Sequence, residues 1–144
     1  MAFEKSVHQK QKGQDRMRWA ITVGAVSAAS AVIIGAVSAH LRVDMSEVQF
    51  GWLETALRYQ IWNTIGLLAV GVLGQVWQTT RFLILSAATL TAGILLFSGS
   101  LYIMATSSYQ DLGIVTPFGG LCLIAGWLFL AVASLSGREK QNQL

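Results

Sequence analysis

The chain has 144 residues, of which 53% are hydrophobic and only 12% are charged, and its net charge is +3. Soluble domains carry roughly 25% charged residues, so this chain has too little charge to cover a water-facing surface. The composition excludes an ordinary soluble domain and predicts an all-α integral membrane protein. The single cysteine, Cys122, excludes a disulfide or a cysteine-based metal site within one copy of the chain.

Residues 1–18 form a polar, basic segment ahead of the first apolar stretch. Its basic residues are Lys5, Lys10, Lys12, Arg16 and Arg18. Such a segment cannot bury enough apolar area to fold by itself, so we expect a flexible or loosely helical lead-in. Under the positive-inside rule, its charge holds this end of the chain in the cytoplasm.

Residues 19–136 hold four apolar stretches, each long enough to cross a membrane. A helix rises about 1.5 Å per residue, so roughly 20 residues cross a hydrocarbon core of about 30 Å. We predict a four-helix transmembrane domain with spans at about 19–40, 53–77, 82–106 and 116–135. The connections between neighbouring spans pair them into two hairpins, and residues 137–144 form a cytoplasmic tail.

The first span carries a stripe of small residues at steps of three and four. The stripe consists of Gly24, Ala28, Ala31, Gly35 and Ala39. Lipid tails are as apolar as side chains, so helices in a bilayer associate through close packing, which small residues allow. We predict that this stripe is a helix-packing face.

The second span begins with charges and contains one strongly polar side chain at greater depth. Glu54 and Arg58 are four residues apart with the acid first, which predicts a local ion pair along the helix. Asn63 lies farther into the span. An amide at that depth should face the bundle and find a hydrogen-bond partner.

Hydroxyl residues mark the third span and the start of the fourth. We expect Ser86, Thr89 and Thr91 to bond back to carbonyl groups of their own helix. Thr116 and Pro117 predict where the fourth span begins, because threonine is a common N-cap and proline suits the first helical position.

The distribution of basic residues predicts the orientation. Of the ten Lys and Arg residues, only Arg42 and Arg58 fall in the connection between spans one and two or at the start of span two. The other eight precede span one, separate spans two and three, or follow span four. This bias predicts four spans with both termini in the cytoplasm.

With this orientation, polar residues from all four spans gather at the outer side of the membrane. We name this set the outer polar cluster: His40, Glu54, Arg58, Tyr59, Gln60, Asn63, Ser98, Ser100, Tyr102 and Thr116. Polar groups near a membrane are normally paired or face a cavity. One interpretation is a small pocket in the outer leaflet for an anionic group such as a lipid phosphate. The other is a hydrogen-bonded network that fixes how the two hairpins dock.

Other chemistry finds no support in the sequence. The two histidines, His8 in the basic segment and His40 at the outer face, cannot form a two-histidine haem site or a histidine-rich metal site in one copy. All seven Asp and Glu residues lie at span ends or in connections, whereas a proton-coupled exporter needs a carboxylate within a span. We expect no cofactor, no metal site, no catalytic residues and no nucleic-acid partner.

Several blocks of the chain, in order, resemble domain-of-unknown-function family 423, the YgdD-like small bacterial inner-membrane proteins. The blocks are residues 35–40 (GAVSAH), 55–60 (TALRYQ), 97–102 (FSGSLY), 116–120 (TPFGG) and 126–127 (GW). The resemblance covers about residues 19–136. It implies four membrane helices in the bacterial inner membrane and no agreed activity.

The chain departs from the family pattern at two places. Ser38 stands where the family tends to have glycine, and Trp62 and Asn63 stand where it tends to have a histidine shortly after Tyr-Gln. If that histidine serves as a ligand or proton carrier, this chain has lost the role, because an amide forms hydrogen bonds but does not titrate.

Three functional hypotheses follow from these observations. The first is a non-enzymatic accessory or organising protein that packs against a larger membrane complex, or forms a homo-oligomer, in contact with membrane lipids. The second is a lipid or small-solute binding protein or carrier that uses the outer polar cluster. The third, with least support, is an enzyme acting on a lipid headgroup.

Overall fold

The computed structural model describes residues 2–77, 81–107 and 109–141, with side chains described at 17–40, 42–77, 81–107, 109 and 111–135. Over these residues every regular element is helical, which confirms the all-α prediction. The elements are α1 (Ala2–Leu41), α2 (Glu47–Val76), α3 (Arg81–Gly93), a π-helical turn η1 (Ile94–Ser98), α4 (Gly99–Thr106), a 3-10 turn η2 (Gln110–Ile114) and α5 (Val115–Gln141).

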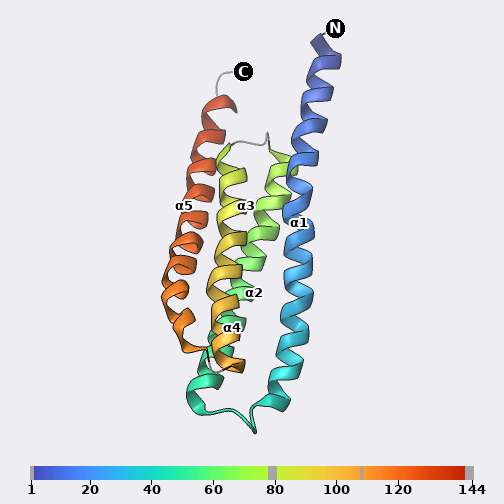
Figure 1. The fold of residues 1–144 in the computed structure, drawn as a ribbon. Coiled ribbons are helices and arrows are strands. Elements are labelled where there is room, and N and C mark those ends of the chain that lie inside the picture. The colour runs from blue at the N-terminus through green and yellow to red at the C-terminus, as the bar shows by residue number, and fades with distance from the viewer. Residues whose placement is uncertain (1, 78–80, 108, 142–144) are drawn as a thin grey trace.

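The elements form four long helical rods, because α3, η1 and α4 follow one another without a break. The rods run up and down in turn, so the start of α1 and the end of α5 lie at the same end of the molecule (Figure 1). The basic segment predicted at residues 1–18 continues the first rod, since α1 begins at Ala2. The side chains of residues 1–16 and of the whole tail predicted at 137–144 lie outside the described side chains.

Three of the four rods are long and apolar enough to cross a membrane by length and composition. They contain the candidate spans Met17–His40, Arg81–Thr106 and Asp111–Leu135. Helix α2 has sufficient length at 30 residues, but it carries more polar side chains. Three of them, Gln60, Asn63 and Thr64, are buried inside the bundle. The polarity of α2 therefore comes in part from residues that do not face the surroundings.

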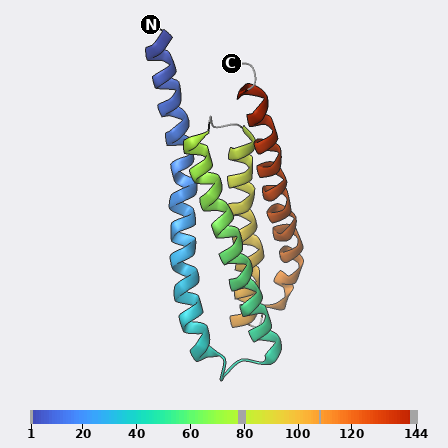
Figure 2. The same ribbon diagram turned by 180° about the vertical axis from the view of Figure 1, so that it is seen from behind.

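The rods pack as two hairpins. Helix α1 lies along α2, and α3 with η1 lies along α5, while α2 also packs on α3, η1 and α4. Over the described residues, α1 and α5 do not pack against each other. They stand at opposite sides of the molecule in both views (Figures 1 and 2). The bundle is therefore open between its first and last helices.

Glycines let the backbones in each hairpin approach closely. A Cβ added at Gly71 of α2 would lie 3.1 Å from the backbone nitrogen of Ile21 in α1. A Cβ at Gly93 of α3 would lie 2.9 Å from the backbone nitrogen of Leu123 in α5. The contact at Gly93 is closer than a Cβ allows, and a Cβ at Gly71 would require its neighbours in α1 to shift, so the absence of a Cβ favours close packing in both hairpins.

Much of the predicted small-residue stripe of α1 lies against α2. A Cβ added at the buried Gly24 would lie 2.7 Å from the Leu68 side chain, and one at Gly35 would lie 3.5 Å from the Leu57 side chain. Ala31 is buried and Ala28 is half-buried, whereas Ala39 is exposed. The stripe thus contacts α2 along most of its length and leaves it near the end of α1.

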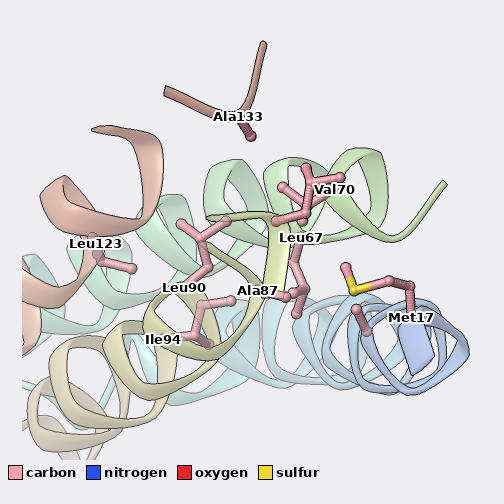
Figure 3. Close-up of a cluster of buried hydrophobic side chains, with 10 residues drawn as sticks. Met17, Leu67, Val70, Ala87, Leu90, Ile94, Leu123 and Ala133 are labelled. Carbon is pink, nitrogen blue, oxygen red and sulfur yellow. The ribbon is translucent and has the colours of Figure 1, made fainter. Parts of the chain in front are cut away.

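Two apolar clusters occupy the two halves of the bundle. The larger includes Met17, Leu67, Leu90 and Leu123 and draws on α1, α2, α3, η1 and α5 (Figure 3). The smaller contains Ala56, Leu101 and Met104 in the half that holds the connections after α1 and α4. Along α2, the buried polar residues lie between the residues of these two clusters.

Candidate functional site

Gln60 of α2 is the centre of a buried group of polar side chains. Its side chain is only 5% exposed. The amide nitrogen donates to the Ser27 carbonyl oxygen at 2.9 Å and to the Ser30 hydroxyl at 2.8 Å. The amide oxygen accepts a hydrogen bond of 2.6 Å from the Tyr102 hydroxyl. Gln60 thereby connects its own helix to α1 on one side and to α4 on the other.

The contact between α1 and α2 holds two further hydroxyl interactions. The Ser27 and Thr64 hydroxyl oxygens lie 2.6 Å apart, within hydrogen-bond distance. The Ser30 hydroxyl donates to the Ser27 carbonyl oxygen at 2.9 Å. Unpaired polar groups are costly to bury, and here each is paired across or along the helices.

Asn63 connects α2 to α5. Its amide nitrogen donates to the Tyr59 carbonyl oxygen at 2.8 Å, and its amide oxygen accepts from the Trp127 indole nitrogen at 2.9 Å. The Trp127 ring rests on Gly66, where an added Cβ would lie 2.7 Å from a ring carbon. The prediction that Asn63 faces the bundle and finds a partner is confirmed.

We name these paired residues the polar layer. It consists of Ser27, Ser30, Gln60, Asn63, Thr64, Tyr102 and Trp127. They come from α1, α2, α4 and α5, so the polar layer connects all four rods. Its groups are amides, hydroxyls and one indole, which are suited to fixing the relative rotation and depth of helices.

A second polar contact joins α4 to the start of α5. The Ser100 and Thr116 hydroxyl oxygens lie 2.8 Å apart. The prediction that Thr116 is an N-cap is wrong, because the 3-10 turn η2 runs directly into α5 at Val115 and Thr116 is already helical. Its hydroxyl instead donates back to the Leu112 carbonyl oxygen at 3.4 Å.

The hydroxyls of α3 divide between local and interhelical bonds. The predicted bonds back to the same helix are confirmed for Thr89 and Thr91, which donate to the Leu85 and Ala87 carbonyl oxygens at 2.8 Å. The prediction is wrong for Ser86. Its hydroxyl donates to the Gly126 carbonyl oxygen of α5 at 2.8 Å. A Cβ added at Gly126 would lie 2.6 Å from the Leu90 side chain, so α3 packs closely on this glycine.

The remaining members of the outer polar cluster lie at its exposed edge. His40, Glu54 and Arg58 have exposed side chains. The predicted ion pair between Glu54 and Arg58 does not occur among the described residues. Both side chains are free to extend away from the helix, which favours solvation over a pair of small energy. Tyr59 is 45% exposed, and its ring lies 4.6 Å from that of Phe97.

Ser98 differs from every other member of the outer polar cluster. It lies at the end of η1 and is 2% exposed, yet its hydroxyl has no hydrogen-bond partner among the described residues. The outer polar cluster therefore separates into three parts: residues of the polar layer or the Ser100–Thr116 contact, exposed residues, and Ser98. No group of His, Cys, Asp or Glu suited to a metal ion occurs where side chains are described.

Several residues of the polar layer were missing from the sequence prediction. Ser27, Ser30 and Thr64 sit in otherwise apolar stretches, where hydroxyls commonly bond to their own helix. Trp127 resembles an interfacial anchor in sequence. The start of α2 lies outside the polar layer and could have been predicted from the sequence, because Ser46 and Gln49 have the spacing of a capping box.

Comparisons with known proteins agree on one family. The family model described as "Protein of unknown function (DUF423)" matches residues 34–120. The UPF0382 inner membrane protein YgdD of Escherichia coli K12 is 35% identical over 124 residues, which cover 85% of this chain and 94% of that protein. A UPF0382 membrane protein of Staphylococcus epidermidis is 39% identical over 121 residues, covering 83% of this chain and 97% of its own.

A third relative, a UPF0382 membrane protein of Haemophilus influenzae, is 35% identical over 120 residues, covering 83% of this chain and 95% of its own. No solved structure matches the chain. A match of 124 residues in a chain of 144 reaches all four rods. The chain is a small integral membrane protein that belongs to the DUF423 family of proteins of unknown function.

Proposed function

We propose that this protein is a non-enzymatic accessory or organising subunit of the bacterial inner membrane that packs against a larger membrane complex. It crosses the membrane four times, with both termini in the cytoplasm. Three candidate spans, the common end of α1 and α5, and the name of the Escherichia coli relative support this arrangement. The basic residues, concentrated at that common end, support the orientation.

The proposal treats α2 as the fourth span. Its length of 30 residues exceeds the roughly 20 that a membrane requires. Its buried polar groups Gln60, Asn63 and Thr64 bond to other rods or to their own helix. In a bilayer, polar side chains are tolerated when they face the bundle interior and are paired.

The pairing of both the amide nitrogen and the amide oxygen of buried Gln60 is the observation that carries the non-enzymatic proposal. Its amide oxygen and nitrogen are engaged by Tyr102, Ser27 and Ser30 from two other rods. A substrate-binding amide needs a free donor or acceptor that faces the substrate. The polar layer instead uses its hydrogen bonds to hold helices together, which suits a protein whose task is to present a defined apolar surface.

That surface is extensive. Large apolar side chains are exposed on every rod, among them Val32 of α1, Trp62 of α2, Leu95 in η1 and Leu128 of α5. Lipid covers such a surface by default, and other membrane helices compete for it through close packing.

Native mass spectrometry of the full chain, extracted from its own membrane in mild detergent, tests the proposal. We expect a complex with a larger membrane protein at fixed stoichiometry. A chain that always emerges alone, with its lipids, contradicts the accessory role. A homo-oligomer without other proteins also contradicts packing against a larger complex. In that case the protein would organise only its own copies.

A second candidate function is binding of an anionic lipid headgroup in the outer leaflet. Arg58 favours it, because its side chain is exposed and has no acidic partner among the described residues. Trp62, one turn farther along α2, is 66% exposed on the same side of the helix. A cation next to an exposed indole is an arrangement that suits the membrane interface.

Retention of phosphatidylglycerol measures this second function. We expect the purified chain to keep phosphatidylglycerol in native mass spectra, Arg58→Ala to lose it, and Arg58→Lys to retain most of it. Equal retention by Arg58→Ala and the unmodified chain excludes a headgroup site at Arg58.

A further inference from the structure

The side-chain hydroxyl of Ser98 lacks a hydrogen-bond partner among the described residues, whereas the other serine and threonine hydroxyls described in the third rod each have one. Thr89, Thr91 and Thr106 donate to the carbonyl oxygen four residues earlier, each at 2.8 Å. Ser107 does the same at 2.6 Å. Ser98 is as deeply buried as the core, yet its hydroxyl lacks a partner among the described residues. A buried hydroxyl without a partner is costly, so this one requires an explanation.

The π-helical turn explains why Ser98 makes no such bond. The acceptor four residues before Ser98 is the Ile94 carbonyl oxygen. In η1 that oxygen accepts from the backbone nitrogen of Gly99, five residues later, and the same nitrogen also donates to the Leu96 carbonyl oxygen. In an α-helical turn, the Ile94 carbonyl would face Ser98 instead.

Gly99 provides the second observation. Its backbone has ordinary right-handed helical angles, φ −61° and ψ −46°, and a Cβ added there would meet nothing within 4 Å. Neither conformation nor packing requires a glycine at this position, in contrast to Gly93 on the same rod. Glycine within a helix lowers stability relative to alanine and increases backbone freedom.

We propose that η1 is a conformational switch. The third rod alternates between the π-helical turn and an α-helical register in which the Ser98 hydroxyl donates to the Ile94 carbonyl oxygen. A π-helical turn contains one residue more than an α-helical turn. When η1 changes to α-helical hydrogen bonding, α4 therefore rotates relative to α3 by about 100°, the rotation per residue in an α-helix. Single π-helical turns often occur at functional positions, as expected of an element with two registers.

The rotation breaks both interhelical hydrogen bonds of α4 and turns the buried Leu101 and Met104 away from Ala56 of α2. Tyr102 leaves Gln60 of the polar layer, and Ser100 leaves Thr116 of α5. The π-helical register satisfies these two contacts and leaves one hydroxyl unpaired, whereas the α-helical register does the reverse. The π-helical register is therefore the major state, and the α-helical register is the minor state of the switch. The switch releases α4 from α2 and α5 in the half of the bundle that carries the connections.

Two spin labels on exposed positions of the full chain measure the rotation. One replaces Ile103 of α4 and the other Val37 of α1, which are 46% and 47% exposed, in a Cys122→Ser background and in phosphatidylethanolamine–phosphatidylglycerol nanodiscs. We expect two distance populations from double electron–electron resonance. Ser98→Ala removes the hydroxyl that gains a partner in the α-helical register, so it should reduce the second population at least threefold.

Ser100→Ala is the matched control, because it removes a hydroxyl that is bonded in the π-helical register. It should enlarge the second population. A single distance population in the parent protein, or a change of less than threefold in Ser98→Ala, overturns the proposal.

Hydrogen–deuterium exchange on the unlabelled chain provides a second measurement that needs no substitution. Residues 94–103 should exchange at least tenfold faster than residues 83–93 of the same rod, since the switch opens the backbone bonds of η1. Equal exchange in the two segments overturns the proposal. The proposed accessory function does not depend on either result.

Discussion

The Tyr102 hydroxyl donates a hydrogen bond of 2.6 Å to the Gln60 amide oxygen, across the contact between α4 and α2. The Gln60 amide nitrogen also donates hydrogen bonds to Ser27 and Ser30 of α1. One amide therefore ties the end of the third rod to the first rod, although these two do not pack directly against each other in that half. The contact between the two hairpins depends on a chain of polar pairs inside an apolar bundle.

Removing the Tyr102 hydroxyl should weaken the bundle. Tyr102→Phe leaves the Gln60 oxygen buried without a donor. Interhelical hydrogen bonds in membrane proteins contribute about 0.6 kcal/mol on average and up to about 1.7, so we expect a loss of about 1 kcal/mol. Thermal unfolding in detergent, followed by circular dichroism, measures it. Tyr109→Phe is the control, because Tyr109 is 71% exposed. Equal melting of the two variants contradicts this role of Tyr102.

The packing of the Trp127 ring on α2 leads to a second prediction. Trp127→Phe removes the donor to Asn63 and leaves space above Gly66. We expect a destabilisation of about 2 kcal/mol from the unpaired amide and the lost ring volume. Trp62→Phe changes an exposed ring and should cost less than about 0.5 kcal/mol. Chemical unfolding of both variants in the same detergent compares them, and a smaller effect in Trp127→Phe than in Trp62→Phe refutes the assignment.

Neighbouring glycines at the start of α5 should respond differently to alanine. A Cβ at Gly119 would meet the backbone nitrogen of Phe97 and lie 2.7 Å from its Cα, and neither atom can move aside. Gly119→Ala should therefore destabilise the protein by about 3 kcal/mol or prevent its accumulation.

Gly120→Ala is the control for this substitution, since its Cβ would lie 3.7 Å from the Phe97 ring, an ordinary contact. It should be tolerated within about 0.5 kcal/mol. Expression level and melting temperature distinguish the two variants, and comparable behaviour would show that the close approach of α5 to η1 is not required.

Cysteine labelling tests the proposed orientation. In a Cys122→Ser background, Asp111→Cys places a thiol in the connection before α5, and Trp77→Cys places one at the exposed end of α2. We expect a membrane-impermeant maleimide to label Asp111→Cys in spheroplasts, and to label Trp77→Cys only after the membrane is opened. The reverse pattern would place both termini outside, and labelling of both thiols in spheroplasts would exclude α2 as a span.

Hydropathy located the ends of the third rod, whereas α1 begins at Ala2 and α2 at Glu47, ahead of the spans expected at about 19–40 and 53–77. The third span was expected at 82–106, and α3, η1 and α4 extend over Arg81–Thr106. The inward position of Asn63 also followed from sequence, because an amide at that depth cannot face lipid at low cost. Its partner Trp127 did not, since a partner on another helix depends on rotation and depth. The sequence did not reveal the π-helical turn for a related reason. Residues 94–98 have the pattern of an ordinary apolar helix, and the close approach of the α5 backbone to η1 at Gly119 is a tertiary contact.

The sequence alone therefore determined the membrane class, the helical content and the family resemblance. Composition and hydropathy are sums over residues, and the positions of spans and glycines can be read along the chain. The tertiary structure decided which polar groups meet. Gly71, Gly93 and Gly119 allow backbones to approach closely, and these approaches set the rotation and depth of each rod. That register pairs Gln60 with Tyr102 and leaves Ser98 unpaired, a difference that no local pattern encodes, because both residues are polar side chains in similar apolar helices.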